Sequence, residues 1–214
     1  MQKKRLIFNL DGTLLTGEAH LTENFYKDRF GEKAYPFILE ISENLDRFER
    51  IFEQYSYEEL AKFLSARSGL SISTRFVREW SDAISEGHDM LDDDAVETLT
   101  YLKKKKFSLA VLTNWFGECQ IRRLKRAGLL DYFDDIYPGD YVLKPHKEAY
   151  LKAKGDFDYD ECVFIGNSLE RDYIAPRAFG MEGILLDRDN QQHETVAKVK
   201  TLGELKGNRR IYGK

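Results

Sequence analysis

The 214-residue chain has only two cysteines, no long apolar run and no excess of positive charge. Cys119 and Cys162 lie far apart, which favours free thiols over a disulfide framework. No stretch is long and apolar enough to span a bilayer, and the apolar run after the basic start is too short for a signal peptide core. A formal net charge of −4 disfavours a nucleic-acid or membrane-surface partner. We therefore expect a soluble, cytoplasmic protein.

The chain is long enough for one buried domain and a smaller appended one, and its pattern changes twice. Within 15–89, helical periodicity predicts four helices: one starting near Thr22, one over 34–54, one after a capping box at Ser56 and one over 73–84. Elsewhere apolar strands alternate with helices, which predicts a parallel, doubly wound sheet. We expect an α/β core of residues 1–14 and 90–214 and a helical domain of residues 15–89.

The first predicted strand, residues 5–8, ends at a group of polar residues. Asn9 and Asp11 are two residues apart, so both side chains should lie on the same side of the strand end. Gly12 then allows the backbone to turn sharply beside them. Alone, Asp-Gly-Thr after a strand is often only a turn.

Three further polar groups follow predicted strands or loops. Thr113 and Asn114 end the strand of residues 107–112, and Lys144 lies in a loop before Pro145. Asn167 and Asp172 follow the strand of residues 162–165, before a short helix expected from about 174. Each has a simpler explanation as a helix cap, a solvated loop or a turn. Taken together, they predict one crevice, because ligands of open parallel sheets bind at the carboxyl ends of the strands.

These four groups, in this order and spacing, resemble the motifs of the haloacid dehalogenase-like (HAD) hydrolases. The segments 125–133 and 177–181 resemble that family's connecting segments, and the helical insert is similar to the cap of its subgroup with a cap between the first two motifs. The resemblance implies a Rossmann-like HAD core with an inserted α-helical cap. One position departs from the family pattern, because the nucleophilic Asp is Asn9 here.

The resemblance also implies the chemistry. HAD phosphatases form an aspartyl-phosphate at the first Asp of the motif, and Asp11 would be the general acid and base. The groups expected to bind the phosphate are Gly12, Thr113, Asn114 and Lys144. The groups expected to hold Mg²⁺ are Asn9, the main-chain carbonyl of Asp11, Asn167 and Asp172. The substrate would be a small phosphate ester, such as a sugar phosphate, a nucleotide or a phosphoglycolate-like compound.

Asn9 leaves alternatives open, because an amide is a poor nucleophile. Loss of a covalent nucleophile lowers kcat by about 10⁴ to 10⁶. The residue either disables an otherwise complete phosphatase, by engineering or in nature, or marks a catalytically silent protein that binds a phosphorylated ligand. We favour the first, because Asp11, Thr113 and Lys144 are all retained. A haloacid dehalogenase is disfavoured, because Asp11-Gly12-Thr13 has the phosphatase form of the motif. The particular ester and the oligomeric state are not specified by the sequence.

Overall fold

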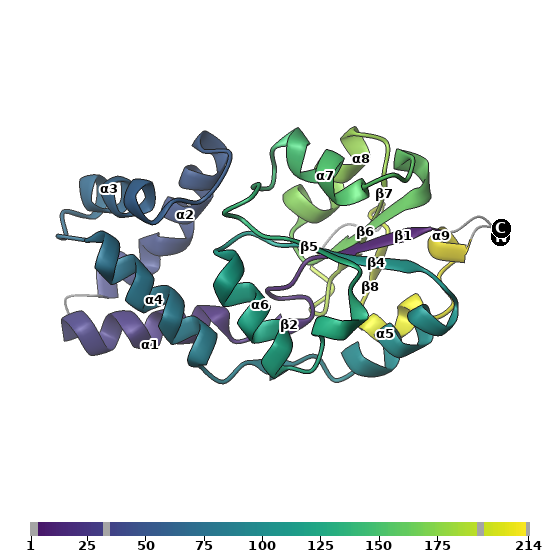
Figure 1. Cartoon of the computed structure of the whole chain (residues 1–214), viewed down its shortest axis with the longest axis horizontal. Helices are drawn as coiled ribbons and strands as arrows, with labels where there is room; N and C mark the ends of the chain where they lie inside the picture. The colour runs from purple at the N-terminus through teal and green to yellow at the C-terminus, as the bar shows by residue number, and fades with distance from the viewer. Residues whose placement is uncertain (1–3, 32–34, 192–194, 213–214) are drawn as a thin grey trace.

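The computed structural model describes residues 4–31, 35–191 and 195–212, and a six-stranded sheet lies at its centre (Figure 1). All neighbouring strands are parallel, in the order β5-β4-β1-β6-β7-β8. The strands are β1 (Arg5–Phe8), β4 (Ser108–Leu112), β5 (Asp135–Tyr137), β6 (Cys162–Gly166), β7 (Glu182–Leu186) and β8 (Lys198–Val199). The chain runs outward from β1 to β5 and returns beside β1 for β6. The doubly wound sheet is therefore confirmed, and its order reverses at β1, where a ligand crevice is expected.

Helices cover both faces of this sheet (Figure 1). On one face lie α5 (Ala95–Lys104) and α6 (Gly117–Arg126), and on the other lie α7 (Lys147–Lys154) and α8 (Ala175–Ala178). Leu6 and Phe8 belong to the apolar cluster of the first face, whereas Ile7 belongs to that of the second. A strand buried on both faces needs a continuous apolar run, and this explains the sequence of β1.

A separate group of helices lies at one end of the sheet, on the left of Figure 1. These helices are α1 (Glu18–Phe30), α2 (Tyr35–Ile51), α3 (Tyr57–Ser68) and α4 (Thr74–Glu86), and together they are called the helical part below. Two short strands that the sequence analysis missed, β2 (Leu15–Thr16) and β3 (Met90–Leu91), pair antiparallel at its two ends. The division into a core and an inserted cap remains a prediction, and this strand pair lies at its proposed boundaries. None of the described helices is long and apolar enough to cross a membrane.

Aromatic residues join the helical part to the sheet. Trp115 and Phe116, from the segment after β4, belong to the same apolar cluster as the core of the helical part. Phe116 stacks on Tyr57 with ring centroids 3.8 Å apart, and Trp115 contacts Trp80 at 4.6 Å. Contacts of this kind contribute beyond the apolar area they bury. They hold the helical part beside the carboxyl end of β4.

Two predicted helix boundaries are wrong. Helix α1 begins at Glu18 instead of Thr22, and the Thr22 hydroxyl donates to Glu18 Oε1 within the helix. The helix expected from residue 174 begins earlier, as the π-helix η4 (Leu169–Ile174) that runs into α8. The reason is that Ser168 caps this helix by accepting a bond from the Arg171 N–H, in a segment that the sequence analysis treated as a turn before the helix. The predicted cap at Ser56 is confirmed for α3.

Replacing Phe116 should weaken this junction strongly. Phe116 is 1% exposed, so Phe116→Ala should lower the free energy of unfolding by about 3–5 kcal/mol through a cavity and lost ring contacts. Ile121→Ala, in α6 and 41% exposed, is the control and should change the free energy of unfolding by less than about 0.5 kcal/mol. Urea unfolding monitored by circular dichroism measures both, and equal effects would contradict the described packing.

Candidate active site

The polar segments that follow β1, β4 and β6 meet at a cavity of about 330 Å³. All but one of the predicted site residues line it: Asn9, Asp11, Thr113, Asn114, Lys144, Asn167 and Asp172. Gly12 is the exception, but it lies against this group. Its φ is +73°, and a Cβ there would come within 2.3 Å of Asn167 Nδ2, so this close approach requires glycine.

Lys144 lies buried at the centre of the group, with 2% of its surface exposed. Its Nζ donates to Asp172 Oδ1 at 2.7 Å and to Asn9 Oδ1 at 3.0 Å. The side chain of Asn114 holds the main chain of the lysine at two points, since its Oδ1 accepts from the Lys144 N–H and its Nδ2 donates to the Lys144 carbonyl. The ammonium group is therefore fixed in place by both its own bonds and those of its loop.

Asp172 is equally fixed. It is completely buried in η4, and its Oδ2 accepts from the Ser168 N–H at 3.0 Å. A Cβ at position 166 would come within 2.3 Å of that oxygen, so Gly166 provides the space for the carboxylate. One oxygen of Asp172 thus faces Lys144, and the other faces the chain of its own helix.

The amide of Asn9 has a defined orientation. Its Nδ2 donates to the main-chain carbonyl of Asp11 at 2.7 Å and to Asn167 Oδ1 at 2.9 Å, while its Oδ1 accepts from Lys144. An ammonium group can only donate and a carbonyl can only accept. This orientation is therefore the one that satisfies both neighbours, and the reverse would place the amide nitrogen against Lys144.

This orientation bears on metal binding. The Asp11 carbonyl, Asn167 Oδ1 and the Asp172 carboxylate are oxygen donors of the kind that Mg²⁺ prefers. In this chain, however, an N–H donor of Asn9 already bonds the first two. The described residues include no group of three or more His, Cys, Asp or Glu suited to a metal ion. The site as it stands therefore fits a divalent cation incompletely. An Asp at position 9 would bring a carboxylate oxygen against the Asp11 carbonyl and Asn167 Oδ1, and a cation between these oxygens would offset their repulsion.

Asn9→Asp should consequently strengthen Mg²⁺ binding by at least about tenfold, because one carboxylate replaces a donor amide. Isothermal titration calorimetry with MgCl₂, on the parent chain and on Asn9→Asp, measures the difference. Adding Asn167→Ala to Asn9→Asp should remove most of the gain. Binding to the parent as tight as to Asn9→Asp would contradict the arrangement described above.

Two residues that the sequence analysis missed hold the Asp11 carboxylate. Gln120 Nε2 donates to Asp11 Oδ2 at 2.7 Å and to Thr113 Oγ1 at 2.9 Å. Arg123, from the next turn of α6, is 1% exposed, and its Nη1 lies 2.6 Å from Asp11 Oδ1. One sequence signal could have identified Gln120 and Arg123. They are three residues apart and lie beside Leu124, so both should lie on the buried side of an otherwise charged helix.

Arg123 also reaches the segment that leaves the helical part. Its Nε and Nη2 each bond Asp89 at 2.8 Å, immediately before β3. Burial acts to lower the pKa of the guanidinium, but the charges of Asp11 and Asp89 prevail and hold that pKa above its ordinary value. Arg123 is thus a permanent cation between the carboxylate of the site and the end of the helical part.

Glu18, at the start of α1, has a pKa well above its ordinary value. Burial, followed by the negative charge of Asp11, raises the pKa of Glu18 to about 7, although Arg123 and the Thr22 hydroxyl act in the opposite direction. Glu18 also lines the cavity. It therefore changes charge near neutral pH.

The pKa of Glu18 makes stability depend on pH. A carboxyl whose pKa is raised by folding stabilises the protein below pH 4.5, and this contribution is lost as the pH rises towards 7. The parent should lose free energy of unfolding between pH 4.5 and 7.5. In Glu18→Gln this loss should be smaller by about 1–2 kcal/mol. Urea unfolding across this range measures it. Glu23→Gln, in the same helix, is the control, because Lys27 lowers the pKa of Glu23 and so keeps its change of charge below this range. Parallel curves for the parent and Glu18→Gln would contradict the assignment.

Helix α2 provides the wall opposite the strand ends. Arg171, in η4, pairs with Asp46 and with Glu49 Oε2, the latter at 2.8 Å. Beside this pair, Arg50 bonds both Asp46 and Glu170. These ion pairs tie the helical part to the sheet across the cavity.

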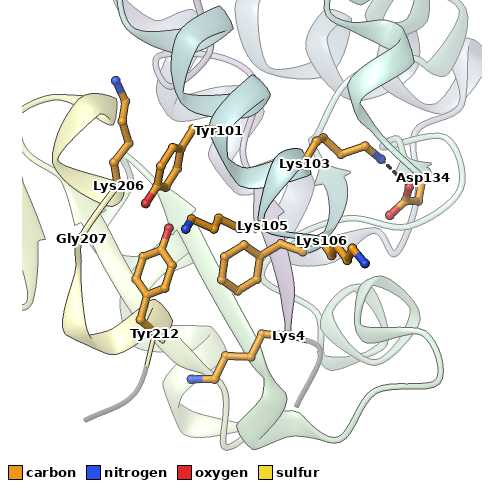
Figure 2. Close-up of a pocket in the computed structure, with 10 residues that line it drawn as sticks. Lys4, Tyr101, Lys103, Lys105, Lys106, Asp134, Lys206, Gly207 and Tyr212 are labelled. Atoms are coloured by element: carbon orange, nitrogen blue, oxygen red, sulfur yellow. Dashed lines mark hydrogen bonds and ion pairs between the residues drawn. The ribbon is translucent and has the colours of Figure 1, made fainter. Parts of the chain in front are cut away.

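A larger cavity, of about 800 Å³, lies at the opposite end of the sheet (Figure 2). Lysines surround it, and the hydroxyls of Tyr101 and Tyr212 point toward one another there. Lys4 and Phe107 in its lining precede β1 and β4, so it lies at the amino ends of the strands. The smaller cavity, at the carboxyl ends, contains the motif residues and is our candidate active site.

Comparisons with known proteins identify the family of the chain. Residues 3–180 match the family model described as haloacid dehalogenase-like hydrolase. The chain is 30% identical over 142 residues to a ribulose-1,5-bisphosphate 5-phosphatase of Halopiger xanaduensis, covering 59% of each protein. It is 23% identical over 157 residues to the pyrimidine 5'-nucleotidase PynA of Streptococcus pneumoniae, covering 71% of this chain and 61% of that protein. The matches thus span less than two thirds of these relatives.

Solved structures share the whole fold. The magnesium-bound HAD-hydrolase YfnB of Bacillus subtilis has a TM-score of 0.73 at 20% identity, covering 96% of this chain and 97% of that one. An L-2-haloacid dehalogenase of Xanthobacter autotrophicus has a TM-score of 0.76 at 18% identity, covering 99% of both chains. At such identities the likeness establishes the fold alone.

Proposed function

The chain belongs to the haloacid dehalogenase-like hydrolases, and from this we propose that its cavity is the site of a magnesium-dependent phosphatase for a small phosphate ester, with Asn9 at the nucleophile position. The observation that carries the proposal is the placement of position 9. Its side chain lies beside the buried ammonium of Lys144 and beside the carbonyl of Asp11, with the Asp11 carboxylate facing the same cavity. The two phosphatase-named relatives support the same reaction class.

Each residue has a part in the proposed reaction. A carboxylate at position 9 would attack phosphorus, and Lys144 beside it would offset the charge that develops on the phosphoryl oxygens. Asp11 would give a proton to the leaving oxygen and later take one from water, in a position held by Gln120 and Arg123. Thr113 would bind the phosphate. Mg²⁺, held by position 9, the Asp11 carbonyl, Asn167 and Asp172, would supply positive charge for the phosphate.

One observation favours a second candidate for the chain as it stands. The Asn9 amide bonds the Asp11 carbonyl, Asn167 and Lys144 without the help of a metal ion. Such a site suits a protein that binds a phosphorylated ligand without turning it over. We rank this candidate second, because Asp11, Thr113 and Lys144 are all retained and line the same cavity.

Asn9→Asp tests the two against each other. It should raise the Mg²⁺-dependent hydrolysis of p-nitrophenyl phosphate by about 10⁴-fold or more. Release of p-nitrophenol measures this, and EDTA should abolish it.

Adding Lys144→Ala to Asn9→Asp is the control and should return the rate toward that of the parent. If Asn9→Asp hydrolyses neither this nor any of a panel of phosphate esters faster than the parent, the binding function is the correct one.

A further inference from the structure

The cavity carries more negative than positive side chains. Among the described residues, five acidic side chains line it, namely Asp11, Glu18, Asp46, Glu49 and Asp172, whereas the cations are Lys144 and Arg171. Even without Glu18, whose pKa is about 7, the acidic side chains outnumber the cations by four to two. Three of these carboxylates, Glu18, Asp46 and Glu49, come from α1 and α2 of the helical part. A substrate whose phosphate lies at the strand ends would therefore present its leaving group to an acidic wall.

Both lining cations are already paired. Lys144 bonds Asp172 at 2.7 Å, and Arg171 pairs with Asp46 and Glu49. Among the described lining residues, no cation is left over for a second anionic group of a substrate. Bringing such a group into a partly buried cavity beside carboxylates is costly, because repulsion is stronger there than in water.

Glu49 is the best-defined acceptor of this wall. It is 5% exposed, its Oε1 accepts from the Tyr55 hydroxyl at 2.6 Å, and its main-chain carbonyl accepts from His146 Nε2 at 2.8 Å. Its Oε2 lies 2.8 Å from Arg171. These bonds hold the carboxyl group in place in the cavity lining. Burial raises the pKa of Glu49, whereas Arg171 and the Tyr55 hydroxyl act in the opposite direction and favour the carboxylate. Each carboxylate oxygen can accept more than one hydrogen bond, so Glu49 can still bond a donor of the substrate, whereas an anionic group there would be repelled.

We propose, resting on the phosphatase function above, that the leaving group of the substrate is neutral or cationic and carries hydroxyl or amino donors, and that Glu49 and Asp46 select it. Sugar and nucleoside monophosphates meet this description. Esters with a second anion, such as phosphoglycolate or a bisphosphate, do not, and neither does a haloacid, whose carboxylate would meet the same wall. Of the two curated relatives, the nucleotidase therefore provides the better guide to substrate chemistry.

Three esters of similar size test the proposal. They are 2-hydroxyethyl phosphate, 2-aminoethyl phosphate and phosphoglycolate, which end in a hydroxyl, an ammonium and a carboxylate. With Asn9→Asp and Mg²⁺, kcat/KM for the first two should exceed that for phosphoglycolate by about tenfold or more. Adding Glu49→Gln should reduce this ratio by about threefold or more. Asp46→Asn, at a more exposed position, should act in the same direction and serves if Glu49→Gln does not fold.

Glu43→Gln is the matched control. Glu43 lies on the same helix, is 63% exposed, pairs with Arg47 and does not line the cavity, so the ratio should not change. Phosphoglycolate hydrolysed as well as the other two esters would overturn the proposal, and so would a ratio unchanged in both Glu49→Gln and Asp46→Asn.

The p-nitrophenyl phosphate assay separates this proposal from the function on which it rests. If Asn9→Asp hydrolyses no ester, the phosphatase function fails, and calorimetric titration of the parent chain with the same three esters then decides the ligand class. Tighter binding of the hydroxyl and amino esters would support it. Binding of phosphoglycolate at least as tight would overturn it.

Discussion

The buried ammonium group of Lys144 is the constraint on which the rest of the site depends. A lysine removed from water must have partners, and here they are the Asp172 carboxylate and the Asn9 amide oxygen. Asn114 holds the main chain of the lysine, and Gly166 leaves room for its counter-ion. Because the ammonium group bonds the amide oxygen of Asn9, the amide nitrogen of Asn9 must face the Asp11 carbonyl. One cation thus determines the orientation of the side chain at position 9.

Two further cations near the cavity are also paired with carboxylates. Arg123 joins Asp11 to Asp89, and Arg171 joins η4 to Asp46 and Glu49. Each of the three lies between elements that are distant in sequence, and each is paired with carboxylates. Each of these three cations is consequently compensated by carboxylates, and none forms an open anion site. Under the proposed function, a phosphate would compete with Asp172 for the ammonium group of Lys144.

The sequence predicted what local patterns can encode. Apart from Arg5, strands β1 and β6 are continuous apolar runs that end in polar motifs. The stripe of apolar residues over 34–54 predicted α2. What it did not predict depends on distant partners. In the sequence, Gln120 is an ordinary polar residue of a charged helix, because its partner Asp11 is 109 positions away. The orientation of Asn9 depends on Lys144, 135 positions away, and strands as short as β2 and β3 carry no periodicity to detect.

The aromatic junction after β4 has a practical consequence. The chain has two tryptophans, Trp80 in the helical part and Trp115 after β4. Their ring centroids lie 4.6 Å apart, where the helical part contacts the sheet. Their intrinsic fluorescence therefore originates from the one place where a movement of the helical part away from the sheet would change the surroundings of both rings. The protein carries its own optical reporter of cavity opening, which can be followed in stopped-flow mixing without any label.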